Sequence, residues 1–288
     1  MTDDPLTVVV STAWLAARLG TTGIRVLDAS WYLPGSARDA AAEYRFGHIP
    51  GAVFFDLDAV SDQESPLPHM LPSAADFAGR MSTLGLNDSD TLVIYDGSGV
   101  NLSSARVWWT FRMFGHERVA VLDGGMGKWR SELRPIEQGE VTPPSGSFTA
   151  RLDHGGVRDL AAVRENIVNR SEQLVDVRSR GRFDGVEPEP RPGLRAGHVP
   201  GSVNLPFTEL VSRDGTLVPP DTLRHLLAEA GVDLDRPVVA TCGSGTSACA
   251  LVLSLHSIGH TQNAVYDGAW AEWGARADTP VETHARDR

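Results

Sequence analysis

The sequence predicts an α/β protein made of two related domains, each a mostly parallel sheet flanked by helices. Similar segments recur in the same order in the two halves of the 288-residue chain. Each half alternates short apolar runs with helix-like stretches, a pattern typical of a parallel sheet covered by helices. A segment rich in Pro, Gly and Ser separates the halves at residues 138–156. We therefore expect domains at residues 1–137 and 157–288, joined by a linker at 138–156.

Matching segments in the two halves define the duplication. The closest match is Gly-His-Ile-Pro-Gly-Ala-Val at residues 47–53, which recurs as Gly-His-Val-Pro-Gly-Ser-Val at residues 197–203. The other matched segments are residues 26–29 with 174–177, 92–99 with 238–245, 114–116 with 258–260, and 121–129 with 265–273. Because the order is the same in both halves, we infer duplicated domains and not a short solenoid repeat. His48 and His198 occupy equivalent positions in the two copies, so we interpret both as structural.

Apolar patterning locates strands and helices within each copy. Residues 26–29 and 174–177 are short apolar runs containing Asp, which is typical of a buried strand. Residues 238–241 form another apolar run that favours β structure. Helices are expected where apolar residues recur at helical spacing, at residues 74–84, 221–230 and 248–257.

Composition and charge exclude several classes of protein. The chain is 41% hydrophobic and 22% charged, with seven Trp, which is typical of a globular protein in solution. No run approaches the ~20 apolar residues that cross a bilayer, and the N-terminus lacks the features of a secretory signal. We therefore expect a cytoplasmic protein with no membrane partner. The net charge of −11 also argues against nucleic acid as a partner, so local arginines must bind any anionic substrate.

The two cysteines of the chain, Cys242 and Cys249, have different settings. They are too few and too close for a disulfide framework, which fits a reducing compartment. They also lack the second Cys or His pair of a zinc site, so no metal is expected. Cys249 lies just inside an expected helix, where a small core residue is the better interpretation. Cys242 instead joins a strand to a helix through a turn of small residues.

The loop after Cys242 predicts an anion-binding turn around a reactive thiol. Ligands bind at the carboxyl ends of parallel strands, and small residues let several backbone N–H groups converge on one anion. The small residues here are Gly243, Ser244, Gly245, Thr246 and Ser247. A free cysteine has a pKa of about 8.5, which a helix N-terminus lowers towards neutrality. We therefore expect Cys242 to be a thiolate nucleophile with a reachable sulfur. A buried, unreactive core cysteine is the alternative that the residues alone leave open.

The duplicated Gly-His-x-Pro-Gly segments and Cys-Gly-Ser-Gly-Thr-Ser-Ala at residues 242–248 resemble the tandem-domain rhodanese-like sulfurtransferases over nearly the whole chain. Within that family, mercaptopyruvate sulfurtransferases carry Cys-Gly-Ser-Gly, whereas thiosulfate-preferring rhodaneses carry basic residues just after the cysteine. The family usually continues Val-Thr-Ala where this chain has Thr-Ser-Ala, a departure that concerns fine tuning and not the chemistry. The resemblance implies two rhodanese-like domains. The first is catalytically inactive, because Asp96 stands where Cys242 stands in the second.

The resemblance also assigns substrate-binding and proton-transfer groups. Arg182 and Arg191 match two arginines that bind the substrate carboxylate, a role that suits planar guanidinium groups. Asp58, His69 and Ser244 match a relay. In it Asp58 orients the imidazole, His69 exchanges a proton, and Ser244 contacts the substrate carbonyl oxygen. From the residues alone, a histidine beside prolines is equally well a loop residue that hydrogen-bonds to the backbone.

These features predict an enzyme that moves a sulfane sulfur from 3-mercaptopyruvate to a thiol acceptor such as thioredoxin, or to cyanide. The Cys242 thiolate attacks the donor sulfur, and pyruvate leaves. The resulting Cys242 persulfide then passes its outer sulfur to the acceptor. No cofactor is required.

Three other functions compete with this one. A thiosulfate:cyanide sulfurtransferase, a rhodanese, would have the same fold and the same persulfide. A non-catalytic rhodanese-like binding module is the second, although the presence of Cys242 with both arginines weighs against it. Cysteine phosphatases also hold a thiolate in an anion-binding loop, but their loop closes with an arginine where this chain has Ala248.

Overall fold

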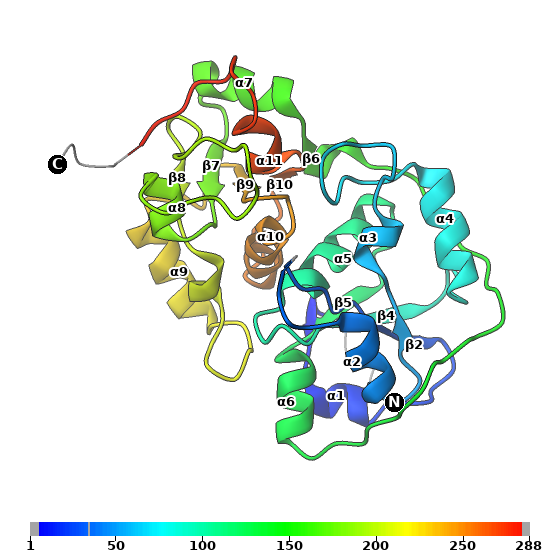
Figure 1. The fold of residues 1–288 in the computed structure, drawn as a ribbon. Coiled ribbons are helices and arrows are strands. Elements are labelled where there is room, and N and C mark those ends of the chain that lie inside the picture. Colours follow the sequence, from blue (N-terminus) through cyan, green and yellow to red (C-terminus); the bar gives the residue numbers. More distant parts are fainter. Residues whose placement is uncertain (1–5, 34, 284–288) are drawn as a thin grey trace. The chain divides into compact units, whose positions relative to one another are not determined.

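The computed structural model describes residues 6–33 and 35–283 (Figure 1). These residues group into two compact units. Unit 1 contains the described residues up to Gln63, Leu71–Asp153 and Val211–Leu217. Unit 2 contains Glu64–Met70, His154–Leu210 and the described residues from Val218 onward. Each unit thus includes one short segment from the other half of the sequence. The domains expected from the sequence are continuous, with boundaries at residues 137 and 157, and do not include these exchanged segments. Those boundaries stay a prediction.

The five strands of unit 1 form one parallel sheet in the order β1-β5-β4-β2-β3. The strands are β1 (Val9–Val10), β2 (Ile24–Asp28), β3 (Val53–Phe54), β4 (Thr91–Tyr95) and β5 (Val119–Leu122). The helices are α1 (Thr12–Ala16), α2 (Ala40–Phe46), α3 (Leu57–Val60), α4 (Ala74–Thr83), α5 (Leu102–Met113) and α6 (Gly125–Ser131). The central strands β4 and β5 are almost wholly buried apolar runs, as expected for a parallel sheet covered on both faces.

Unit 2 repeats this arrangement with a parallel sheet in the order β6-β10-β9-β7-β8. The strands are β6 (Val157–Arg158), β7 (Gln173–Asp176), β8 (Val203–Asn204), β9 (Val238–Thr241) and β10 (Asn263–Tyr266). The helices are α7 (Leu160–Asn169), α8 (Arg180–Asp184), α9 (Pro220–Glu229), α10 (Ala248–Ser257) and α11 (Ala269–Trp273), with short 3₁₀ turns η1 (His154–Gly156) and η2 (Phe207–Leu210). Because each strand has its counterpart at the same place in the other sheet, the predicted α/β fold and its duplication are confirmed.

The helices expected from apolar spacing form close to their expected bounds. Helix α4 starts after Ser73, whose hydroxyl oxygen accepts a hydrogen bond from the Asp76 amide at 3.1 Å, and it buries Phe77 and Met81. Helix α10 is buried over most of its length because nearly all its side chains are small or apolar. Within the residues that the structure describes, no helix is both long and apolar enough to cross a membrane.

The duplicated histidines have the same surroundings in both units. His48 Nδ1 lies 3.0 Å from the Tyr44 carbonyl oxygen, and the two rings stack. His198 Nδ1 lies 2.7 Å from the Phe183 carbonyl oxygen, with its ring stacked in the same way. Each histidine also forms an antiparallel bridge with a glutamate downstream in its own unit. This shared geometry agrees with the structural interpretation of both residues.

Candidate active site

Cys242 is the first residue after β9, at the carboxyl end of a central strand of the unit 2 sheet. The loop from Cys242 to Ser247 leads directly into α10. Helix α11 fixes its path, because the amides of Trp270 and Ala271 donate to the carbonyl oxygens of Cys242 and Gly243, each at 2.9 Å. The strand, loop and helix expected around this thiol are therefore present.

The backbone amides of this loop are available to bind an anion. In the part of the chain that the structure describes, the amides of Gly243, Ser244, Thr246 and Ser247 donate no hydrogen bond to any group. Gly245 has a φ of +76°, a conformation that favours glycine and allows the tight turn. Unpaired amides at the start of a helix stabilise negative charge.

The equivalent loop of unit 1 holds a carboxylate. Asp96, the counterpart of Cys242, is 1% exposed. Its carboxylate accepts hydrogen bonds from the amides of Ser98 and Ser104, at 2.8 and 2.9 Å, and from the Ser98 hydroxyl at 2.5 Å. In the copy that lacks the thiol, the equivalent loop therefore holds a buried carboxylate through hydrogen bonds from backbone amides.

Cys242 is buried, with 1% of its surface exposed. Its near neighbours in the loop are polar, since Ser244 and Thr246 are also buried. The sulfur therefore does not lie at an open surface, as a reachable thiol would. Cys249 is completely buried, and its Sγ donates to the Gly245 carbonyl oxygen at 3.3 Å, which agrees with a packing role.

Arg182 places a positive charge against the cysteine loop. A Cβ atom built on Gly243 would lie 2.9 Å from Arg182 Nη2, so the guanidinium group directly covers this glycine. Helix α8 positions the arginine, because the hydroxyl oxygen of its N-cap residue, Ser179, accepts from the Arg182 amide at 3.4 Å. A side chain larger than that of glycine at position 243 would displace the guanidinium group.

Glu189 holds Arg182 and is itself shared with a second arginine. Arg182 Nη2 donates to Glu189 Oε2 at 2.5 Å, and Arg178 Nη1 donates to Glu189 Oε1 at 2.6 Å. Arg178 is fully buried and also pairs with Asp176, and its guanidinium stacks over the Trp270 ring at 4.4 Å. Burial lowers the pKa of Arg178, but the charges and hydrogen bonds of Asp176 and Glu189 outweigh this and raise it overall.

Neither Glu189 nor Arg178 was singled out by the sequence analysis. The signal lay in the run Glu187-Pro188-Glu189-Pro190-Arg191, where acidic residues stand beside the expected arginine. Whether such an acid is solvated or buried depends on the fold. In the structure the Glu189 side chain is 3% exposed, and its charge is used entirely within unit 2.

His69 lies within unit 2, although it precedes the rest of that unit by many residues in the sequence. It is 6% exposed, and its φ of +59° is unusual for a residue with a side chain. Its Nδ1 lies 3.0 Å from Thr246 Oγ1 in the cysteine loop. Among the described residues the Ser244 hydroxyl makes no hydrogen bond, so the loop group bonded to this imidazole is Thr246 and not Ser244.

The remaining expected site residues are placed less directly. Asp58 belongs to unit 1, in the first turn of α3, where its carboxylate accepts from Trp31 Nε1 at 3.0 Å. Arg191 belongs to unit 2, on the irregular segment after α8, and is partly exposed. Unit 2 therefore brings together the cysteine loop, Arg182 and His69, while the part played by Asp58 stays a prediction.

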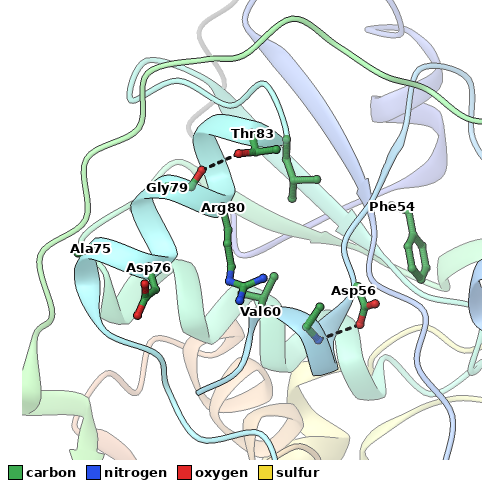
Figure 2. Close-up of a pocket in the computed structure, with 10 residues that line it drawn as sticks. Phe54, Asp56, Val60, Ala75, Asp76, Gly79, Arg80 and Thr83 are labelled. Atoms are coloured by element: carbon green, nitrogen blue, oxygen red, sulfur yellow. Dashed lines mark hydrogen bonds between the residues drawn. The ribbon is translucent and has the colours of Figure 1, made fainter. Parts of the chain in front are cut away.

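A separate pocket of unit 1, shown in Figure 2, offers no comparable chemistry. It has a volume of about 530 Å³ and is lined by no cysteine or histidine. Two of its polar side chains hydrogen-bond to helix backbone: Asp56 accepts from the Ala59 amide at 3.0 Å, and the Thr83 hydroxyl donates to the Gly79 carbonyl oxygen at 3.0 Å (Figure 2). Among the residues with a described position, no three His, Cys, Asp or Glu side chains group as a metal site would require.

Comparisons with known proteins place the chain in a family. The model of the rhodanese-like domain matches twice, at residues 11–132 and 159–276. Thiosulfate/3-mercaptopyruvate sulfurtransferase 1, mitochondrial, of Arabidopsis thaliana is 41% identical over 297 residues, which cover 96% of this chain and 78% of that protein. Human 3-mercaptopyruvate sulfurtransferase is 46% identical over 274 residues, covering 93% and 92% of the two chains.

The crystal structure of SseA from Escherichia coli, described as a 3-mercaptopyruvate sulfotransferase, superposes with a TM-score of 0.85 at 39% identity. The match covers 92% of this chain and 99% of that one. The two matches of the domain model and the similarity to these relatives over most of the chain agree with one another. This chain therefore belongs to the rhodanese-like family and carries two copies of its domain.

Proposed function

We propose that this protein is a sulfurtransferase that takes sulfur from 3-mercaptopyruvate and carries it on Cys242. This proposal rests on one observation. Four backbone amides of the described loop after Cys242 donate no hydrogen bond, and the Arg182 guanidinium lies against Gly243. A thiol, a group of amides and a cation in one place suit a thiolate that attacks an anionic donor and then holds a persulfide. Relatives named for this donor support the same choice.

The proposed transfer balances without a cofactor. The Cys242 thiolate gives an electron pair to the donor sulfur, and the S–S bond forms as the bond from that sulfur to the methylene carbon breaks. The electron pair of the broken bond stays on pyruvate as its enolate. The proton of the donor thiol ends on the same carbon, so the products are pyruvate and the Cys242 persulfide anion. A thiol acceptor such as thioredoxin, or cyanide, then takes the outer sulfur and restores the thiolate.

Each proposed side chain has one task in this cycle. Arg182 and Arg191 bind the donor carboxylate, and the Ser244 hydroxyl contacts the donor carbonyl oxygen. His69 carries the donor's thiol proton to the enolate carbon, and Asp58 orients the imidazole. The amides of Gly243 to Ser247 stabilise the persulfide. Unit 1 has a carboxylate in place of the thiol and serves a structural purpose.

A second donor, thiosulfate, is the main competing proposal, because the Arabidopsis relative is named for both donors. Thiosulfate carries two negative charges, whereas residues 243–248 contain no Lys or Arg. We therefore expect kcat/KM for 3-mercaptopyruvate to exceed that for thiosulfate by about tenfold or more. Steady-state assays of both donors with one acceptor measure this ratio, and a preference for thiosulfate would assign the rhodanese activity instead.

A conservative change at Arg182 tests donor binding. Arg182→Lys is expected to raise KM for 3-mercaptopyruvate about tenfold, because a lysine cannot contact both Glu189 and the donor with a planar fork. Arg180→Lys is the matched control on the same helix, since Arg180 is exposed and pairs with Glu209 at 2.9 Å. An unchanged KM in Arg182→Lys would remove this arginine from the binding site.

We also propose that the protein works in a reducing compartment, the cytoplasm. Cys242 and Cys249 form no disulfide in the structure. A persulfide passed to a thiol acceptor needs that acceptor in its reduced form, which a reducing compartment maintains. Detection of the protein by fractionation of the cells that produce it would test this location.

A further inference from the structure

One hydrogen bond joins the cysteine loop to the imidazole of His69. Thr246 Oγ1 and His69 Nδ1 lie 3.0 Å apart, and the two residues are 3% and 6% exposed. The contact bridges 177 residues of sequence and lies wholly within unit 2. Thr246 is also a position at which the loop departs from the family pattern described above.

A hydroxyl group can hold an imidazole through a complete proton cycle. Thr246 Oγ1 donates a hydrogen bond to Nδ1 when that nitrogen carries no proton. After rotation about its C–O bond, the same oxygen accepts from Nδ1 when that nitrogen is protonated. The ring therefore keeps its place whichever of its nitrogens carries the proton. A methyl group could do neither and would leave a buried nitrogen facing an apolar atom, which is costly.

The backbone at His69 is also held in one geometry. A φ of +59° is a left-handed conformation, which is unfavourable for a residue other than glycine and persists where the surroundings impose it. Glu64–Met70, the segment that contains His69, groups with unit 2 and not with its own half of the chain. The contact with Thr246 ties this segment to the cysteine loop.

We propose that Thr246 is the positioning residue for His69: its hydroxyl holds Nδ1 and so fixes the orientation in which the imidazole takes the donor's thiol proton and delivers it to the enolate carbon. This inference rests on the proton-transfer role proposed for His69. Thr246 stands four residues after Cys242 in the same loop. The hydrogen bond therefore fixes the imidazole relative to the attacking sulfur.

The two donors differ in their need for this proton. With 3-mercaptopyruvate, the thiol proton must move to carbon as the sulfur is transferred. With thiosulfate, the Cys242 thiolate attacks the outer sulfur, and sulfite leaves with the electron pair of the broken S–S bond. No proton moves in that transfer. Comparing donors in one variant therefore separates a loss of proton transfer from a general disturbance of the loop.

The test is Thr246→Val, which removes the hydroxyl and keeps the branched shape. Single-turnover persulfide formation from 3-mercaptopyruvate is expected to slow about 10- to 100-fold. Its KM in steady-state assays should change less than about twofold, because the carboxylate is bound elsewhere. Persulfide formation from thiosulfate should change less than about threefold. Thr246→Ala, which lacks the hydroxyl and adds no bulk, is measured beside it in case the valine variant fails to fold.

A conservative variant and a double variant provide two further tests. Thr246→Ser retains a hydroxyl and should restore the 3-mercaptopyruvate rate to within about threefold of the original chain. The double variant of Thr246→Val with His69→Gln should be no slower than His69→Gln alone, because Thr246 acts through His69. Additive losses would show that Thr246 acts in another way.

The outcomes distinguish the two proposals. A normal 3-mercaptopyruvate rate in His69→Gln would overturn the proton-transfer role of His69. A slow His69→Gln beside a normal Thr246→Val would leave that role standing and overturn the positioning of the ring by Thr246. Equal losses with both donors in Thr246→Val would identify a structural residue and overturn the inference as well.

Discussion

Replacing Cys242 with serine is expected to lower kcat/KM for sulfur transfer by about 10⁴-fold or more, since loss of a covalent nucleophile removes the shared intermediate. A serine hydroxyl forms no persulfide. The measurement combines steady-state assays with mass spectrometry after treatment with 3-mercaptopyruvate. The original chain should gain the mass of one sulfur atom on the Cys242 peptide, and Cys242→Ser should gain none.

Cys249→Ser is the matched control for this result, because the chain has no other cysteine. A serine at position 249 can still donate to the Gly245 carbonyl oxygen, as the Cys249 thiol does at 3.3 Å. We expect its activity to stay within about threefold of the original, as for a conservative change away from the reacting atoms. Sulfur found on Cys249, or an original chain that gains no sulfur at all, would contradict the assignment. The second result would favour a non-catalytic binding module.

The fold could be predicted because its signals are local and occur twice. Short apolar runs ending in polar residues gave the strands, and the repeated order of segments gave the duplicated sheets. Helix α10 begins and ends at the expected residues, 248 and 257. The assignment of residues 64–70 and 211–217 to opposite units could not be predicted. It depends on contacts between segments distant in sequence, which leave no local pattern.

The candidate site divides in the same way. The setting of Cys242 was predictable because strand, small-residue turn and helix follow one another in the sequence. The shared use of Glu189 by two arginines was not, because burial of an acid is a property of the folded chain. The contact of Thr246 with His69 joins residues 177 positions apart, and composition carries no sign of it.

The two copies also show that the shared fold does not by itself determine the chemistry of the loop. In unit 1, Arg38 pairs with Glu43 at 2.6 Å and donates to the Gly97 carbonyl oxygen at 3.1 Å. In unit 2, Arg182 pairs with Glu189 and lies against Gly243, the counterpart of Gly97. Each copy therefore sets an arginine–glutamate pair beside the first glycine of its loop. The two loops differ chemically in the residue before that glycine, Asp96 in one copy and Cys242 in the other, and at position 246, where Thr replaces the Val100 of unit 1.

Glu189→Gln is expected to lower the free energy of unfolding by about 3 kcal/mol, because it removes one partner of a buried ion pair. Arg178 is fully buried. After the change, Asp176 is the remaining acid that balances the positive charges of Arg178 and Arg182. A loss of this size is a large part of the 5–15 kcal/mol that stabilises an ordinary protein. Urea unfolding curves with equal slopes would measure it.

Glu187→Gln is the matched control, since Glu187 is exposed and contacts the Ser179 hydroxyl at 2.7 Å on the same segment. Its effect on stability should stay within about 0.5 kcal/mol. Glu189→Gln should also raise KM for 3-mercaptopyruvate, because Arg182 loses the carboxylate that holds it. Since both changes act on the cation at position 182, the KM increases of Glu189→Gln and Arg182→Lys should not multiply in the double variant. Unchanged stability in Glu189→Gln would mean that Asp176 alone satisfies Arg178, and multiplied KM effects would mean that Glu189 acts apart from Arg182.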